Sequence, residues 1–392
     1  QGFLDIAKEK GIYAEWSTNE KVALEAAIGA SFSGLKSLVN MKSFGINVCS
    51  DSLFPLAYTG TKAPMVIVVA DDPSCWSSAQ SEQDSRGYAY LSRIPIVEPA
   101  DPQEAYEFTK LAFKVSEKFN TPVILRITTR VAHQRMPVRF LGIKTENKVF
   151  QKGEFIKDYK RFSTMPPRVL EMKKELLEKI EKIRQFAEKS QLNKIDKSKK
   201  SAKAGIIASG VAYLHAKEAM SELNLDLPVF KLGLFYPLPD KKIKDFIKPL
   251  KKVLIAEETD PYIEKEIKAL AKEVNSRIEI FGKNVLPETG ELNQEKITFA
   301  LSKILGIKYK KPKIIISNLP RRHPQLCSGC PYWLAFSALK KSSPEGTIFA
   351  GDIGCNMLAG VSPHNIQDFL FSMGASIGIG HGVKKSTDQK VI

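Results

Sequence analysis

The chain has 392 residues, of which 43% are hydrophobic and 26% charged, the composition of a soluble globular protein with two or three domains. Its formal net charge is +16, but the lysines are spread over predicted helical faces and linkers, without a recognition motif or a membrane-length apolar run. We therefore expect neither nucleic acid nor a membrane as partner. Five unevenly placed cysteines argue against a disulfide framework and favour a reducing cytoplasm.

Residues 1–160 predict a first α/β module. Apolar runs of strand length occupy 63–70, 94–97 and 122–125, and a helical stretch over 102–119 separates the last two. Strands that are apolar on both faces predict a parallel sheet covered by helices. In such sheets the binding site lies beyond the carboxyl ends of the strands.

The rest of the chain predicts a helical linker and two further modules. An amphipathic helix over 170–186 and a lysine-rich polar stretch over 189–203 form the linker, residues 161–203. The second module, 204–310, has predicted strands at 205–208, 228–232, 253–256 and 277–281. The third, 311–392, has a strand at 347–350, a helix at 374–385 and the start of a strand at Val391. The predicted fold class is α/β, with consecutive doubly wound parallel-sheet modules.

Two kinds of local pattern indicate ligand binding. Asn19 can cap the helix that Glu20 opens, and the alanines that follow form a small-residue face; this suits a flat ligand, or simply a helix packed tightly on a sheet. Glycines recur at 351–355, directly after the strand predicted at 347–350, and again at 374–382. They either allow a phosphate to approach the backbone closely or form tight turns.

The order of three motifs is more specific than any one of them. Cys327-Ser-Gly-Cys330, Gly351-Asp-Ile-Gly-Cys355 and Met373-Gly-Ala-Ser-Ile-Gly378 follow one another, and the trio resembles the diphosphate-binding domain of indolepyruvate:ferredoxin oxidoreductase catalytic (alpha) subunits. Upstream, motifs similar to the family's pyrimidine domain lie at 71–73, 81–86, 98–104 and 126–130. Motifs similar to its transketolase-C-like domain lie at 205–210, 235–239 and 290–293.

The resemblance implies thiamine diphosphate as cofactor, which stores the electrons released when a 2-oxoacid is decarboxylated. By resemblance Glu20 is the carboxylic acid that faces the aminopyrimidine ring, and Glu15 and Glu25 match less well. The diphosphate is expected on two backbone segments: Gly351, Asp352, Gly354 and Cys355, and Gly374, Ala375, Ser376 and Ile377.

The family also implies metals and partners. Mg²⁺ ligands are expected beyond Ile392, and [4Fe–4S] clusters mostly in a domain further on. Cys327, Cys330 and Cys355 are candidate iron–sulfur ligands, or small packing residues of the turns. The expected reaction is oxidative decarboxylation of an aryl-pyruvate with CoA and ferredoxin, by an enzyme that includes a smaller beta subunit.

Departures from the family pattern keep two alternatives open. Trp76 stands in a loop that usually carries a Met-His pair, and Tyr332 and Trp333 follow the second cysteine in place of His-Arg. The alternatives are another thiamine-diphosphate 2-oxoacid oxidoreductase or decarboxylase, or a scaffold that has lost catalysis. The chain lacks an initiator Met and stops at an incipient strand, so we expect it to be part of a longer protein. Because the Mg²⁺ ligands are expected beyond Ile392, we expect these 392 residues alone to bind the cofactor poorly or not at all.

Overall fold

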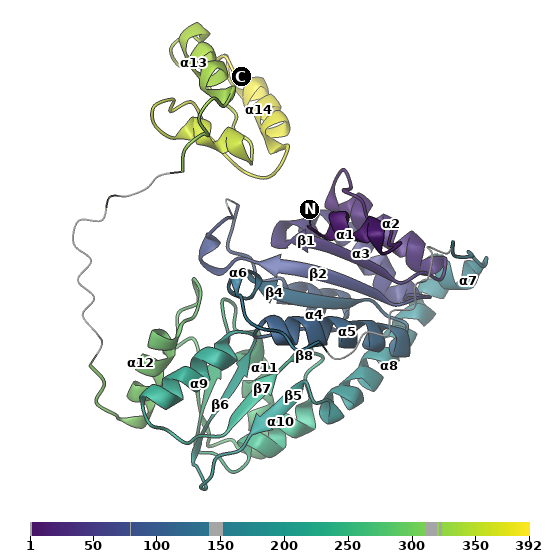
Figure 1. Ribbon diagram of the computed structural model, residues 1–392, viewed down its shortest axis with the longest axis vertical. Helices are drawn as coiled ribbons and strands as arrows, with labels where there is room; N and C mark the ends of the chain where they lie inside the picture. Colours follow the sequence, from purple (N-terminus) through teal and green to yellow (C-terminus); the bar gives the residue numbers. More distant parts are fainter. Residues whose placement is uncertain (1, 79, 141–151, 311–319, 321–323) are drawn as a thin grey trace. The chain divides into compact units, whose positions relative to one another are not determined.

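The computed structural model describes residues 2–78, 80–140, 152–310, 320 and 324–392, which form two compact units (Figure 1). The first unit comprises residues 1–76 and 82–311, and the second residues 77–81 and 312–392. Across these described ranges, no helix combines the length and the apolar character needed to cross a membrane.

The first sheet confirms the predicted doubly wound module. Its strand order is β1-β2-β4-β3-β8, and the first four strands, those that belong to residues 1–160, are parallel. The helix predicted over 102–119 is present with these bounds, whereas the strand at 94–97 is reduced to two residues. The elements of this part are α1 (Gly2–Glu9), α2 (Glu20–Phe32), β1 (Ser37–Lys42), α3 (Ser43–Thr59), β2 (Met65–Asp71), η1 (Pro73–Cys75), α4 (Arg86–Ser92), β3 (Ile96–Val97), α5 (Pro102–Phe119), β4 (Val123–Thr128), α6 (Thr129–His133), α7 (Tyr159–Phe162) and α8 (Arg168–Lys189).

The second sheet has the order β10-β9-β6-β7-β5, and its outermost strand corrects the sequence prediction. Part of the stretch interpreted as linker forms β5, which pairs antiparallel with β7 and buries Asn193 completely. The elements of this part are β5 (Asn193–Asp196), β6 (Ala204–Ser209), α9 (Ala212–Glu222), β7 (Val229–Leu232), β8 (Leu234–Tyr236), α10 (Asp240–Ile247), β9 (Lys252–Ala256), α11 (Tyr262–Val274), β10 (Glu279–Phe281) and α12 (Gln294–Leu305).

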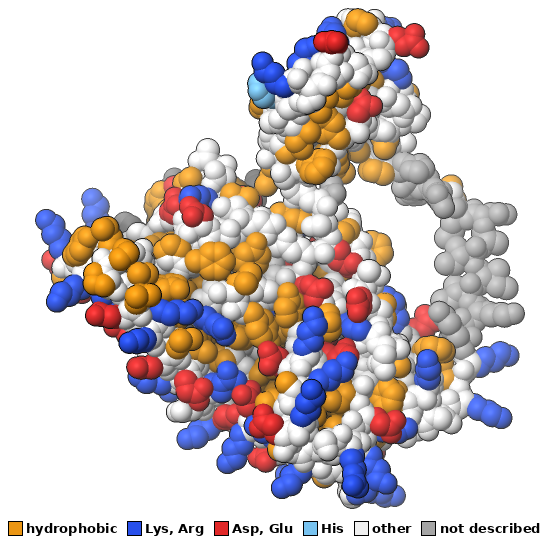
Figure 2. All heavy atoms as spheres, turned by 180° about the vertical axis from the view of Figure 1, so that it is seen from behind, with side chains coloured by type: hydrophobic (Ala, Val, Ile, Leu, Met, Phe, Trp, Pro, Cys, Tyr) orange, Lys and Arg blue, Asp and Glu red, His pale blue; other side chains and the backbone are white. Residues whose placement is uncertain are grey.

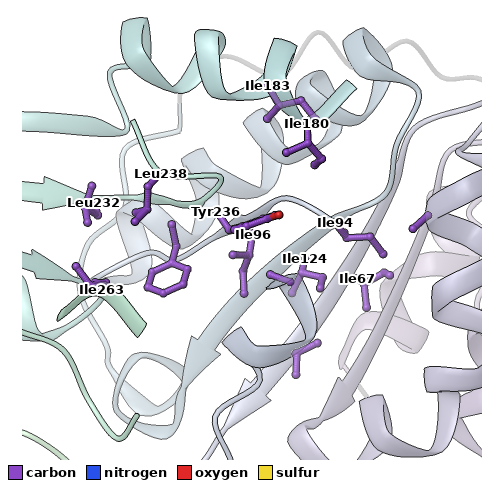
Figure 3. Close-up of a cluster of buried hydrophobic side chains, with 14 of the residues drawn as sticks. Ile67, Ile94, Ile96, Ile124, Ile180, Ile183, Leu232, Tyr236, Leu238 and Ile263 are labelled. Atoms are coloured by element: carbon purple, nitrogen blue, oxygen red, sulfur yellow. The ribbon is translucent and has the colours of Figure 1, made fainter. Parts of the chain in front are cut away.

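One continuous segment belongs to both sheets. β7 lies in the second sheet, and after Gly233 the chain enters the first sheet as β8, antiparallel to β3. A side chain at Gly233 would meet the Leu192 carbonyl oxygen at 2.6 Å, so only glycine allows the two sheets to approach here. The hydrophobic core is likewise continuous: Ile96 and Ile124 of the first sheet share a buried cluster with Leu232 of the second (Figure 3). The two modules therefore form one folded body.

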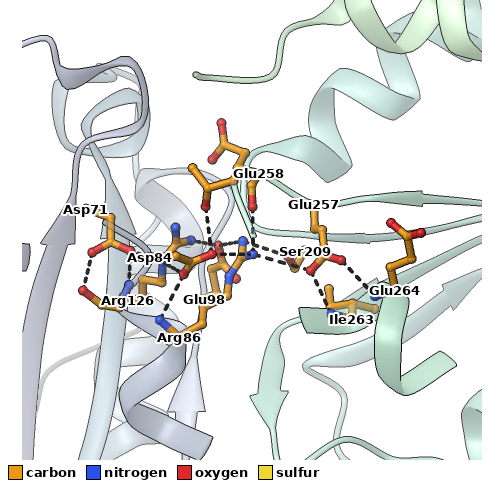
Figure 4. Close-up of polar contacts among 12 residues, drawn as sticks. Asp71, Asp84, Arg86, Glu98, Arg126, Ser209, Glu257, Glu258, Ile263 and Glu264 are labelled. Carbon is orange, nitrogen blue, oxygen red and sulfur yellow. Dashed lines mark hydrogen bonds and ion pairs between the residues drawn. The ribbon is translucent and has the colours of Figure 1, made fainter. Parts of the chain in front are cut away.

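A buried ion network lies where the strands of both sheets end (Figure 4). The Arg126 guanidinium lies 2.6 Å from Asp71 and contacts Glu98, which also lies 3.0 Å from Arg86. Arg86 donates across the junction to the Glu258 carbonyl oxygen at 3.2 Å, and it lies 3.7 Å from the Glu257 carboxylate. Both arginine side chains are completely buried, so their charges must be compensated by these partners.

The network contains more acids than the two arginines neutralise. Burial raises the pKa of Glu257 and of Glu258 to about 7, and the nearby arginines offset that rise only in part. By contrast, the pKa of Glu98 is lowered because two arginines outweigh its own burial. Glu257 also accepts hydrogen bonds from the backbone N–H groups of Ile263 and Glu264, so it caps α11 from outside the helix.

The second unit has little regular structure besides two long helices. Its elements are α13 (Tyr332–Ser342), η2 (Cys355–Gly360) and α14 (Ala375–Ser386), around a small core formed by Phe336, Ala359 and Ile366. The strand predicted at 347–350 makes only two isolated parallel bridges, Ile348 with Val391 and Ala350 with Phe369. The helix predicted at 374–385 is confirmed as α14.

The surface bears out the spread of charge predicted from the sequence. On the face drawn in Figure 2, basic side chains alternate with acidic ones and with apolar groups. An example of an exposed pair is Lys21 with Asp51, whose charged groups lie 2.6 Å apart.

The network predicts a large difference between buried and exposed arginines. Replacing Arg126 by Met leaves Asp71 buried without its cation and Glu98 with Arg86 as its remaining partner, so the free energy of unfolding should fall by about 3–5 kcal/mol. The matched control Arg168→Met removes ion pairs with the exposed Glu171 and Glu175 on α8 and should cost less than about 1 kcal/mol. Urea unfolding followed by circular dichroism measures both. Equal losses for the two variants would contradict a stabilising role for the network.

The raised pKa values predict how stability changes with pH. The folded chain holds more protons on Glu257 and Glu258 than the unfolded chain between pH 4.5 and about 7, so the free energy of unfolding falls as pH rises through that window. Glu258→Gln should make this slope less negative by up to about 1.4 kcal/mol per pH unit. Chemical denaturation across the window tests it, with the exposed Glu171→Gln as control. A slope unaffected by Glu258→Gln would refute the assignment.

Candidate active site

Glu20 lies where the sequence predicts, at the start of α2. Asn19 caps this helix by accepting a hydrogen bond from the Val22 N–H at 3.0 Å. The Glu20 stem packs against Gly45, where a Cβ atom would lie 2.5 Å from Glu20 Cγ. The side chain is half-buried, and none of the residues described here forms a hydrogen bond or an ion pair with its carboxylate. The carboxylate is therefore available to a ligand.

The carboxyl ends of three parallel strands lie at one edge of the sheet, and Glu20 packs against Gly45, just after the first of them. Gly45 follows β1 closely, and the register aligns Lys42 of β1 with Ala70 of β2, and Asp71 of β2 with Thr128 of β4. Lys42 lies 3.8 Å from Asp72, which also accepts a hydrogen bond from the Thr129 hydroxyl at 2.6 Å. A single row of polar side chains thus runs along this edge of the sheet, as expected for a site in a parallel α/β module.

The loop after β2, residues 72–76, has an unusual backbone. Ser74 and Cys75 both have left-handed φ angles, 71° and 51°, which non-glycine residues rarely adopt. Glu82 holds the loop by accepting hydrogen bonds from the Ser74 and Gly290 N–H groups, each at 2.7 Å. Ser74 Oγ in turn accepts from the Glu291 N–H at 2.7 Å. Sequence reasoning missed Glu82, whose role depends on a segment more than 200 residues away.

A hollow of about 260 Å³ opens beside this loop. Arg130 and Glu291 form a two-pronged ion pair at its wall, with distances of 2.5 and 2.7 Å. The lining residues are Trp76, Thr129, Arg130, His133, Gln134 and Glu291. The motifs at 126–130 and 290–293 thus meet, although the sequence assigns them to different modules.

In the second unit, Asp352 joins the two glycine-rich segments. Its carboxylate accepts hydrogen bonds from the Gly374 N–H at 3.0 Å and from the Ser376 hydroxyl at 2.7 Å. These contacts lower the pKa of Asp352, and they place a carboxylate at the start of α14, where an anion is favoured. Left-handed φ angles at Gly354 and Gly374 accompany this close approach. The two predicted diphosphate segments are therefore adjacent, with Asp352 between them.

The cysteines are not gathered into a metal site in the described ranges. No three His, Cys, Asp or Glu side chains are arranged there to hold a metal ion. Cys327 and Cys330 belong to one turn before α13, where the Cys330 N–H donates to the Cys327 carbonyl, and Cys355 begins η2. In these ranges Cys327, Cys330 and Cys355 do not form such a group, and their assignment as iron–sulfur ligands stays a prediction.

Comparison with known proteins assigns this architecture. A family model described as pyruvate flavodoxin/ferredoxin oxidoreductase, thiamine diphosphate-binding, matches residues 7–204, and an indolepyruvate oxidoreductase domain matches residues 194–317. The chain belongs to the pyruvate flavodoxin/ferredoxin oxidoreductase family of thiamine-diphosphate enzymes. The family resemblance carried by the sequence motifs is confirmed.

The chain is also similar to curated proteins named as indolepyruvate oxidoreductase subunits. It is 40% identical to indolepyruvate oxidoreductase subunit IorA of Methanothermobacter thermautotrophicus, covering 99% of this chain and 63% of that protein. Identity to the Thermococcus kodakarensis subunit is 42%, covering 96% and 60%. The chain thus spans less than two thirds of these relatives.

A solved structure supports the same fold. The 2-oxoglutarate:ferredoxin oxidoreductase from Magnetococcus marinus superposes with a TM-score of 0.58 at 15% identity, over 77% of this chain and 59% of that one. The likeness confirms a thiamine-diphosphate-type α/β fold.

The position of Asp352 yields a prediction about α14. Asp352→Ala removes the acceptor of the Gly374 N–H, and loss of such a cap should destabilise this helix start by about 1 kcal/mol. Hydrogen exchange should then accelerate at Gly374 and Ser376, whereas the exposed control Asp388→Ala should leave both amides unchanged. Unaltered protection in Asp352→Ala would mean that the carboxylate does not hold the two segments together.

Proposed function

We propose that this chain provides the cofactor-binding part of an enzyme that oxidatively decarboxylates aryl-pyruvates of the indolepyruvate type. One 2-oxoacid, one CoA thiol and two oxidised ferredoxins would give one acyl-CoA, carbon dioxide, two reduced ferredoxins and a proton. The names of the curated relatives support the substrate class. The observation that carries the proposal is the available carboxylate of Glu20 at the ligand-binding edge of the sheet.

The residues at this edge fit the pyrimidine part of thiamine diphosphate. Glu20 is half-buried beside Gly45 and Met41, and the absence of a side chain at Gly45 leaves room for the acid. Bound thiamine diphosphate supplies a carbanionic carbon that adds to the 2-oxo group and accepts the electrons released with carbon dioxide. The Glu20 carboxyl group would hold a proton against a nitrogen of the aminopyrimidine ring. This contact would favour the form of the cofactor that has the carbanionic carbon.

The second unit supports diphosphate binding, but by fewer of the residues than the sequence implies. Asp352 already accepts hydrogen bonds from Gly374 and Ser376, so these groups are shared with a carboxylate rather than free for the ligand. A diphosphate beside Asp352 adds negative charge, which a hard cation such as Mg²⁺ would balance through oxygen ligands. In the proposed assignment the phosphates lie against the backbone of the turn at Gly354 and Cys355 and of the helix start at Ala375 and Ile377.

Further parts of the proposal concern the assembly. We infer a smaller beta subunit, ferredoxin as electron acceptor, [4Fe–4S] clusters between cofactor and ferredoxin, and a cytoplasmic enzyme. The subunit name of the curated relatives supports a multi-subunit oxidoreductase. The excess of basic residues over acidic ones, 59 against 43, supports attraction of an acidic protein or of CoA phosphates.

Replacing the proposed catalytic acid tests the function directly. In the complete oxidoreductase, Glu20→Gln should lower kcat for indolepyruvate by about 10²–10⁴-fold, because the amide cannot exchange the proton. Proton exchange at the reactive carbon of thiamine diphosphate, followed by NMR, should slow equally.

Glu25→Gln is the matched control. Glu25 lies on the same helix but is exposed and accepts a hydrogen bond from Ser52 at 2.6 Å, so its variant should keep full activity. Wild-type proton exchange in Glu20→Gln would overturn the assignment of the acid. A folded wild-type oxidoreductase that oxidises no 2-oxoacid would instead favour a scaffold role.

A further inference from the structure

The hollow beside Trp76 lies close to the proposed catalytic acid. Glu20 packs at the end of β1, and the hollow opens at the ends of β2 and β4. β4 is the second strand from β1 in the sheet, so the two positions belong to the same edge, where the parallel strands end. Contacts from Lys42 to Asp72, and from Asp72 to Thr129, connect them. A substrate held near Glu20 can therefore extend into the hollow.

The loop that forms one wall of the hollow is held in a single conformation by hydrogen bonds. Two consecutive left-handed residues, Ser74 and Cys75, cost free energy that the fold must offset, and such strain concentrates at ligand clamps. Glu82 fixes the strained loop to Gly290 through its two backbone hydrogen bonds. The result is that Trp76, the next residue, is presented with 67% of its surface exposed at the mouth of the hollow.

The charge of the hollow discriminates between classes of 2-oxoacid. Arg130 is neutralised by its two-pronged ion pair with Glu291. Its charge is therefore not available to a second carboxylate on the side chain of a 2-oxoacid. The exposed indole ring offers a flat face for stacking, and His133 and Gln134 supply polar groups for a ring N–H or hydroxyl. The volume of about 260 Å³ lies below the range of roughly 300–1,000 Å³ for drug-sized ligands and suits one or two fused rings.

We propose that this hollow is the specificity subsite that receives the aromatic side chain of the 2-oxoacid, with Trp76 as the stacking surface. The inference rests on the proposed function, since it takes Glu20 to mark the reacting end of the substrate. It names Trp76, a departure from the family's usual pattern, as the residue that favours an aryl group over a small or a doubly charged 2-oxoacid.

Steady-state kinetics of the complete oxidoreductase with indolepyruvate and with pyruvate tests the subsite. Trp76→Ala should raise KM for indolepyruvate about tenfold, the size of a lost ring contact, with kcat for indolepyruvate and KM for pyruvate unchanged. Trp76→Phe keeps a flat ring and should restore KM to nearly the wild-type value. Phe299→Ala removes an exposed aromatic side chain of α12 and serves as the control that changes neither substrate's constants.

Calorimetric binding of indolepyruvate to the same complexes separates this proposal from the proposed function. Weaker binding to Trp76→Ala than to Phe299→Ala supports the subsite even if the wild type turns over no 2-oxoacid, in which case only the proposed function fails. If the wild type is active but Trp76→Ala shifts both substrates alike, or neither, the subsite is refuted while the function stands. A wild type that neither binds nor oxidises indolepyruvate overturns both.

Discussion

Two completely buried arginines, Arg86 and Arg126, are the interaction on which the first unit depends. They reach the carboxylates that terminate strands of both sheets, so the two modules cannot separate without exposing unpaired charges. The shared segment β7–β8 and the common hydrophobic core reinforce this junction. The polar edge of the first sheet thus rests on a rigid base, which lets the loop after β2 maintain a strained backbone.

The charged residues of this junction were noticed in the sequence as parts of family motifs, but their structural role was not. Asp84, Arg86, Glu98 and Arg126 lie within motifs that resemble the pyrimidine domain of the family. In the structure, Arg126 pairs with Asp71 and Glu98 within the first module. Arg86 also reaches Glu257 and the Glu258 carbonyl oxygen of the second module. A charged residue inside an apolar strand, such as Arg126, is the available signal, because a buried charge needs a partner elsewhere in the chain.

Local patterns predicted most of the first unit, and long-range pairing accounts for the rest. The helix α5 and the apolar strands β2 and β4 follow from periodicity, and Glu20 follows from its cap and from resemblance. β1 and β5 were missed because neither is a continuous apolar run and because each pairs with a strand distant in sequence. The meeting of Trp76 with Arg130 and Glu291 likewise depends on the packing of two modules, which no local pattern encodes.

The most direct measurement is an electron-microscopy structure of the complete oxidoreductase with thiamine diphosphate and Mg²⁺ bound. The account predicts that a ring nitrogen of the aminopyrimidine lies within hydrogen-bond distance, roughly 2.6–3.2 Å, of the Glu20 carboxylate. The diphosphate should then lie on the turn around Gly354 and the start of α14. A cofactor whose pyrimidine ring contacts another carboxylate, such as Glu15, or lies away from the carboxyl ends of β1 and β2, would contradict it.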